Sequence, residues 1–183
     1  MARRLAARAT PTHEARPMSP YLAVLLLAGV ALLQTTLAPH LSIIGGRPQF
    51  VLLTVVSWAL LRGGREGVVW GFAGGVMLDL LSGAPFGITT LPLLLVGYLS
   101  GLGEINVFRA NFLLPGLVAL AATLLFNTVV LLLMQLLGQS VFWEPALLHV
   151  ILPAVVANLL VLPLFYLPLR RLHRLTAQPQ MSV

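Results

Sequence analysis

The chain has 183 residues, of which 58% are hydrophobic and only 9% are charged, and its mean hydropathy is +0.96. These values exclude a soluble globular domain, in which about 25% of residues are charged. The net charge of +6 comes from arginines outside the apolar runs, so it concerns membrane orientation and not nucleic-acid binding. Cysteine is absent, which excludes disulfides, thiolate catalysis and cysteine-ligated metals within the chain.

The hydropathy pattern predicts an all-α fold, a polytopic membrane bundle of about six transmembrane helices. Residues 1–18 have two prolines and no apolar periodicity, so we expect a flexible cytoplasmic tail. Residues 19–169 are expected to form the six-helix transmembrane domain, and residues 170–183 a basic cytoplasmic tail. The predicted spans are 21–38, 50–61, 66–81, 88–102, 112–137 and 149–169.

Prolines and aromatic residues add detail to these spans. The last span contains three prolines, at which the helix is expected to be kinked or broken. Tryptophan and tyrosine side chains are enriched where a membrane meets water, and four of the six in this chain lie near predicted span ends. We therefore expect interfacial anchors at Trp58, Trp70, Trp143, Tyr21, Tyr98 and Tyr166.

The distribution of arginine supports an even number of spans. With six spans, ten of the eleven arginines lie on one side of the membrane, and only Arg47 lies on the other. The positive-inside rule then places both termini in the cytoplasm, whereas a five-span chain would place the C-terminal arginines outside. Besides the N-terminal arginines, the residues expected to set this orientation are Arg62, Arg65, Arg109, Arg170, Arg171 and Arg174.

A stripe of small residues in the third span ends at a single acid. Gly67, Gly71, Gly75 and Asp79 are four residues apart and therefore share one face of a helix. Glycines allow another helix to approach closely, and a carboxylate in a bilayer is expected to face protein or water. The stripe is therefore predicted to be a contact face, either with the fourth span, which offers Gly97 and Gly101, or with another protein.

Asp79 can be interpreted as a polar anchor, as an ordinary residue or as part of a proton relay. It precedes the segment SGAPFG, in which Gly83, Pro85 and Gly87 predict a tight reversal between the third and fourth spans. The carboxylate either caps this turn or accepts a hydrogen bond from a partner helix, or it is an ordinary residue close to the membrane surface. A proton relay is the third alternative, although relays usually use a chain of ionisable groups.

No residue pattern indicates catalysis or a metal site. His40, His149 and His173 fall at predicted span ends or in the basic tail, and neither HExxH nor a paired-carboxylate motif is present. The uncharged polar residues within the spans are expected to form hydrogen bonds between helices, although Asn127 and Asn158 would also suit a cavity for a polar ligand. These residues are Gln34, Asn127, Gln135 and Asn158.

The central segment resembles a known family. The sequence GFAGGVMLDLLSGAPFGITTLPLLLVGYLSG, which ends at Gly101, is similar to the glycine-rich, aspartate-containing segment of MreD, the bacterial rod shape-determining membrane protein. The preceding RPQFVLLTVVSWALLRGGREG resembles the second span of that family. Gln49 departs from the family, in which this position is often acidic. The residues that carry the likeness are Gly71, Gly75, Asp79, Gly83, Pro85, Gly87 and Tyr98.

The resemblance implies a protein of the bacterial inner membrane that is not an enzyme and has no cofactor. It implies binding to MreC and coupling of cytoplasmic MreB filaments to RodA and penicillin-binding protein 2. The implied fold is similar to the substrate-binding membrane subunits of energy-coupling-factor transporters, so the alternative function is that of a ligand-binding subunit for vitamin uptake. Whether the protein forms a homodimer is left open by the sequence.

Overall fold

The structure is a computed structural model that describes residues 20–41, 43, 45–102 and 113–176. Every regular element in this part of the chain is helical, which confirms the predicted fold class. Since α6, η1 and α7 follow one another without a gap, the described residues form six helical segments. These elements are α1 (Pro20–Leu37), α2 (Phe50–Arg62), α3 (Gly64–Ser82), α4 (Thr90–Ser100), α5 (Leu113–Leu136), α6 (Trp143–Ala146), the π-helix η1 (Leu147–Ile151) and α7 (Leu152–Thr176).

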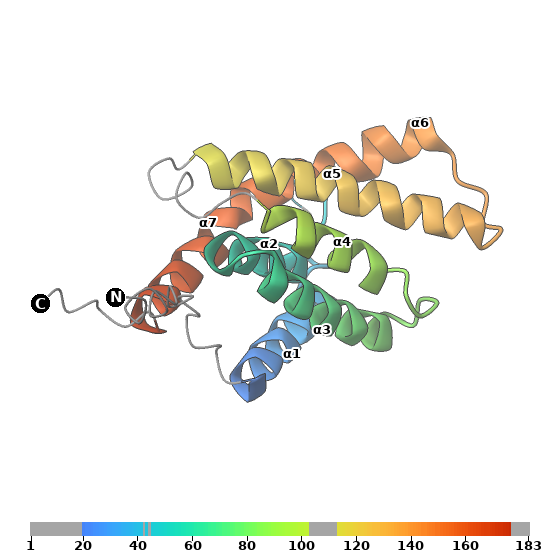
Figure 1. Cartoon of the computed structure of the whole chain (residues 1–183). Coiled ribbons are helices and arrows are strands. Elements are labelled where there is room, and N and C mark those ends of the chain that lie inside the picture. The colour runs from blue at the N-terminus through green and yellow to red at the C-terminus, as the bar shows by residue number, and fades with distance from the viewer. Residues whose placement is uncertain (1–19, 42, 44, 103–112, 177–183) are drawn as a thin grey trace, which may run out of the picture.

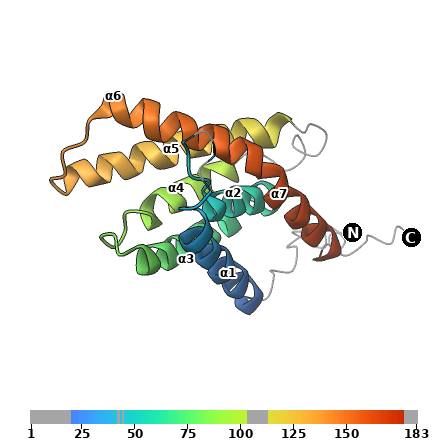
Figure 2. The ribbon, with the colours of Figure 1, turned by 180° about the vertical axis from the view of Figure 1, so that it is seen from behind.

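Helix α2 forms the centre of the bundle. Its sequence is apolar on all sides, and every residue from Phe50 to Leu60 is buried, as expected for a helix without a polar face. It contacts α1, α3, α4, α5 and α7. Figures 1 and 2 show α5 and α7 on one side of α2, and α1, α3 and α4 on the other.

The helices are antiparallel in chain order, so the bundle has two distinct ends. The arginine-rich end contains the α2–α3 turn at Gly63 and the last residues of α7. The opposite end contains residues 45–49, the α3–α4 turn and the α5–α6 turn. In both views the hairpin of α5 and α6 projects beyond the α3–α4 turn at this opposite end (Figures 1 and 2).

The helices differ in length more than the predicted spans do. By length and composition, Leu113–Leu136 and Trp143–His173 are long and apolar enough to cross a membrane. Helices α2 and α4 have 13 and 11 residues, which correspond to about 20 Å and 17 Å. Both are shorter than a hydrocarbon core of about 30 Å. The predicted fourth span starts at residue 88, two residues before α4, which begins at Thr90.

The last span is longer than predicted and continuous. Pro163 and Pro168 lie inside α7 without ending it, whereas the π-helical turn Leu147–Ile151 comes just before Pro153. The axis changes direction along α7, as Figure 2 shows. The basic segment predicted to be a tail from residue 170 continues α7 as far as Thr176. It stays helical because Leu169 and Leu172 pack on the central core.

Candidate functional site

The glycine stripe of α3 lies against α4. A Cβ atom built on Gly67 would overlap the carbonyl oxygen of Gly97, and one on Gly71 would overlap the carbonyl oxygen of Leu93. A Cβ atom on Gly75 would meet Cα of Thr90, and one on Gly101 would meet the backbone of Gly64. The two backbones therefore touch along the whole length of α4. Because Gly67, Gly71 and Gly75 are buried in this contact, a partner protein has no access to the stripe.

Asp79 is bound by the turn that follows its helix. Its Oδ2 atom accepts hydrogen bonds from the backbone N–H of Gly87 at 2.8 Å and of Thr90 at 3.2 Å, and from the Thr90 hydroxyl at 2.5 Å. Its Oδ1 atom accepts from the backbone N–H of Thr89 at 2.9 Å and from the Thr89 hydroxyl at 2.6 Å. Asp79 is only 4% exposed. The carboxylate thus serves as the N-terminal cap that α4 does not obtain from Thr89.

The turn itself has the backbone geometry that its sequence suggests. Gly83 and Gly87 adopt positive φ angles of 66° and 99°, which residues other than glycine rarely adopt. Pro85 lies between them, and its carbonyl oxygen accepts a hydrogen bond from the N–H of Ile88 at 3.3 Å. Asp79 therefore closes a loop whose backbone turns at two glycines. Its negative charge also lies at the N-terminus of α4, which is the positive end of the helix dipole.

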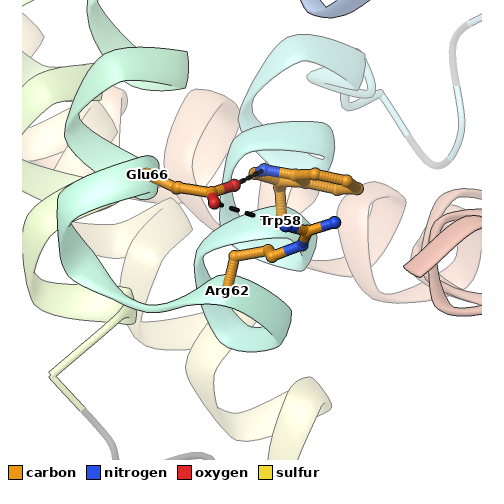
Figure 3. A network of polar contacts seen from close by, with 3 residues as sticks. All are labelled: Trp58, Arg62 and Glu66. Atoms are coloured by element: carbon orange, nitrogen blue, oxygen red, sulfur yellow. Dashed lines mark hydrogen bonds and ion pairs between the residues drawn. The ribbon is translucent and has the colours of Figure 1, made fainter. Parts of the chain in front are cut away.

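A second polar cluster lies at the arginine-rich end (Figure 3). Trp58 Nε1 donates a hydrogen bond to Glu66 Oε2 at 2.8 Å, and Arg62 forms an ion pair with Glu66 Oε1 at 3.5 Å. The Arg62 guanidinium lies 5.1 Å from the ring centroid of Trp58, within the range of a cation–π contact. The Arg62 side chain is only 2% exposed. Arg62, one of the residues expected to set the membrane orientation, has its side chain enclosed by the protein, where it joins α2 to α3.

The other predicted orientation residues are distributed differently. Arg65 and Arg171 are exposed, and Arg170 is partly exposed. Arg109 lies outside the described residues, as does the tail 1–18. Arg174 lies in the last turn of α7, beyond the side chains that the structure describes.

Three of the six tryptophan and tyrosine side chains are not interfacial anchors. Trp58 and Trp70 are buried and stack on each other, with ring centroids 4.4 Å apart and an interplanar angle of 20°. Tyr166 is buried against Leu53 and Ala119. The expectation for these three residues is wrong, because aromatic rings near the end of a helix can also fill the space between helices. The other three tryptophan and tyrosine side chains, Tyr21, Tyr98 and Trp143, are exposed.

A third polar cluster joins four helices at the start of α2. The backbone N–H of Gln49 donates to Asn158 Oδ1 at 2.7 Å, and Asn158 Nδ2 donates to Gln49 Oε1 at 3.1 Å and to Thr123 Oγ1 at 3.0 Å. Gln49 Nε2 donates to Asn127 Oδ1 at 3.0 Å. Gln34 Oε1 accepts from the N–H of Val51 at 2.8 Å. The expected hydrogen bonds between helices are confirmed for these side chains, which bind α1, α5 and α7 to the start of α2.

A cavity of about 550 Å³ adjoins this cluster at the opposite end of the bundle. Its walls come from the end of α1, residues 45–49, the end of α3, η1 and the start of α7, and Thr89 and Asn127 complete the lining. Arg47 and His149, which the sequence did not connect, both line it. The described residues contain no group of three His, Asp or Glu side chains that could hold a metal ion.

Large apolar side chains cover the outside of this all-helical bundle, while Asp79, Asn127 and Asn158 are buried and hydrogen-bonded within it. This combination defines a helical membrane protein. A family model described as rod shape-determining protein MreD matches residues 15–175, so the chain belongs to the MreD family of rod shape-determining membrane proteins. No solved structure matches the chain.

Proposed function

We propose that this protein is a non-enzymatic scaffold of the bacterial elongation complex, which binds MreC and supports cell-shape control and lateral peptidoglycan synthesis. The family match over residues 15–175 is the observation that carries this proposal. RodA, penicillin-binding protein 2 and MreB would then be reached through the complex, and a homodimer is compatible with the same role.

The buried polar clusters support a scaffold role. Asp79 accepts five hydrogen bonds from its own chain, and Arg62 and Glu66 are paired with each other. Groups held in this way stabilise a fixed arrangement of helices. A rigid bundle of this kind suits a protein whose task is to hold a partner in place.

The partner surface is proposed to lie on the exposed helix faces and not on the glycine stripe. Beyond Asn127, α5 has no buried residue, and several large apolar side chains of α5 and α7 face outward. A single transmembrane helix of MreC can pack laterally on such a surface without entering the core. Exposed side chains suited to mapping this contact are Leu132 and Leu164, with Leu25 and Phe72 on the other side of the bundle.

Photocrosslinking tests this proposal. A photoreactive amino acid is placed at each of these four exposed positions, one at a time, and the protein is irradiated in its native membrane. We expect a covalent adduct with MreC at Leu132 or Leu164. If none of the four positions yields MreC while all four variants are present in the membrane at normal amounts, lateral docking is contradicted.

A ligand-binding subunit of a vitamin transporter is the alternative function, and the cavity of about 550 Å³ is the observation that favours it. Its volume lies within the range of small-molecule sites. The two functions differ in their partners, because a transporter subunit would be recovered with a pair of ATPases and a coupling membrane subunit.

The proposed membrane arrangement is multi-pass, in the inner membrane, with both termini in the cytoplasm. The exposed Arg65 and Arg171 support it, since both lie at the arginine-rich end of the bundle. The only arginine at the opposite end of the described chain is Arg47. Arginines near a membrane surface also attract anionic lipid, each contributing roughly 1 kcal/mol.

A further inference from the structure

The cavity at the opposite end of the bundle carries a positive charge. Arg47 lines it and is exposed, and no aspartate or glutamate is among the residues that line it. Asp79 lies in the wall behind Thr89, but its oxygens are bound to Gly87, Thr89 and Thr90. The cavity therefore favours a negatively charged occupant.

Further polar groups of the lining have capacity for hydrogen bonds. The ring of His149 interacts through Nδ1 with the carbonyl oxygen of Pro145 at 3.2 Å. Because a carbonyl oxygen only accepts, Nδ1 carries the hydrogen, and Nε2 of the neutral ring is left to accept a hydrogen bond from a hydroxyl. The Ser82 hydroxyl accepts a weak hydrogen bond from the N–H of Ala84 at 3.4 Å, which leaves its own hydrogen to donate. The Arg47 guanidinium and the Ser82 hydroxyl therefore suit an oxyanion with several acceptor atoms, and His149 Nε2 suits a hydroxyl group of the same occupant.

Part of the remaining wall is apolar. Pro39, Leu78, Val150 and Ala154 line the cavity. The end of α5 and the π-helical turn η1, at the same end of the bundle, also expose large apolar side chains. These are Leu132, Leu136, Leu147 and Leu148. An occupant with an anionic headgroup and hydrocarbon chains would contact both the polar groups around Arg47 and the apolar side chains. A water-soluble anion would contact only the polar groups.

The walls of the cavity are fixed by the backbone. Gly46 is buried, and a Cβ atom on it would overlap the carbonyl of Pro153, so residues 45–49 are held tightly against α7. His149 and Val150 belong to the π-helical turn, a geometry that is often found at functional sites. This turn places both residues in the cavity wall.

We propose that this cavity binds the phosphate headgroup of an anionic membrane lipid, with Arg47 paired to the phosphate and the acyl chains lying along the exposed faces of α5 and the α6–η1 segment. The volume of about 550 Å³ accommodates a headgroup larger than phosphate alone. The proposal is independent of MreC binding, since it depends only on groups within this chain.

Lipid titration of the purified full-length protein tests the proposal. Dioleoylphosphatidylglycerol is added to the protein in mild detergent, and native mass spectrometry measures the affinity of the first lipid bound. We expect Arg47→Gln to weaken this affinity about tenfold, because a charge-assisted contact is lost. Arg65→Gln is the matched control, since Arg65 is equally an exposed arginine but lies at the other end of the bundle, and it should leave the affinity unchanged.

A second pair of variants tests the cavity without altering charge. Val150→Trp should fill the cavity and weaken phosphatidylglycerol binding, whereas Leu160→Trp, on an exposed face of α7 away from the cavity, should not. Both positions are exposed, so neither change disturbs the core.

Three outcomes would overturn the proposal. The first is an equal loss of binding in Arg47→Gln and Arg65→Gln, which would indicate general attraction of lipid to arginine. The second is unchanged binding in both Arg47→Gln and Val150→Trp. The third is binding of glycerol 1-phosphate as tight as that of the lipid, which would identify a water-soluble phosphate as the ligand.

Discussion

Asp79 determines how α3 connects to α4. Its carboxylate accepts three backbone N–H bonds and two hydroxyl bonds from residues that come eight to eleven positions later. Without this carboxylate, the backbone N–H groups at the start of α4 would have no hydrogen-bond acceptor in their largely apolar surroundings. One charge in a membrane protein is therefore used to join two helices.

Replacement of Asp79 by alanine is expected to lower the free energy of unfolding by about 2 to 4 kcal/mol, because several buried donors lose their acceptor. Thermal unfolding in detergent, followed by size-exclusion chromatography with fluorescence detection, measures the change. Glu144→Ala is the matched control, since Glu144 is exposed and should tolerate the change. Equal stability of Asp79→Ala and the wild type would contradict the capping role.

Gly71→Leu is expected to be more damaging than Asp79→Ala, with a loss of at least about 3 kcal/mol, because the new side chain meets the backbone of Leu93 and backbone atoms cannot move aside as side chains do. The yield of monodisperse protein and its Tm measure the effect. Gly29→Ala should stay within about 1 kcal/mol of the wild type, since a Cβ atom there has open space. Normal folding of Gly71→Leu would show that α3 and α4 are not in close contact.

Arg62 shows what a sequence cannot reveal about a single residue. Its position between two apolar runs predicts a surface turn, and the helix does end there. Its burial depends on Trp58 and Glu66, which bring a ring face and a carboxylate to the guanidinium only when α2 and α3 are folded together. A count of the arginines on each side of the membrane treats Arg62 as a solvated charge, although it is paired inside the protein.

At the scale of the elements, the polar cluster at the start of α2 connects helices that are far apart in sequence. Gln49 and Asn158 are 109 positions apart, yet they exchange two hydrogen bonds. Thr123 adds α5 to the same group. The cluster fixes the depth at which α5 and α7 pack against α2, because sliding any one helix would leave amide groups unpaired.

Asn158→Leu is expected to destabilise the bundle by about 2 to 4 kcal/mol, because the N–H of Gln49 and its side-chain oxygen lose their partners. Its Tm and its susceptibility to limited proteolysis are the measurements. Val156→Leu, at a partly lipid-facing position two residues earlier, serves as the control and should behave as the wild type does. A tolerated Asn158→Leu would mean that the amide cluster contributes little to packing.

The helices could largely be predicted from sequence, because apolar runs are separated by glycine and proline. The predicted second span, 50–61, differs from α2 by one residue at its end. The start of α4 was missed because it depends on Asp79, which binds Thr89 and Thr90 through tertiary contacts. The helical continuation to Thr176 was missed because it depends on packing of Leu169 and Leu172.

The candidate sites were less predictable for the same reason. The spacing of Gly67, Gly71 and Gly75 indicates a contact face, but it cannot say which helix covers that face. The cavity depends on residues from six separate stretches of chain, and only the isolation of Arg47 among apolar segments marked it in the sequence.

For the whole molecule, the proposed orientation places the arginine-rich end in the cytoplasm. The chain has no cysteine, so single cysteines can be labelled without background. Ser140→Cys, in the exposed α5–α6 turn, should react with an impermeant maleimide added to spheroplasts. Arg65→Cys should react only after the membrane is permeabilised. The reverse pattern would contradict the orientation, and labelling of both before permeabilisation would contradict the number of crossings.

The scaffold function is tested most directly by purifying the protein from its native membrane in mild detergent and identifying what remains bound by mass spectrometry. The account predicts recovery of MreC at a near-stoichiometric yield. The same purification with Gly29→Ala should give the same yield, since this change leaves the packing intact. Recovery of a pair of ATPases with a coupling membrane subunit, and no MreC, would contradict the account in favour of vitamin uptake.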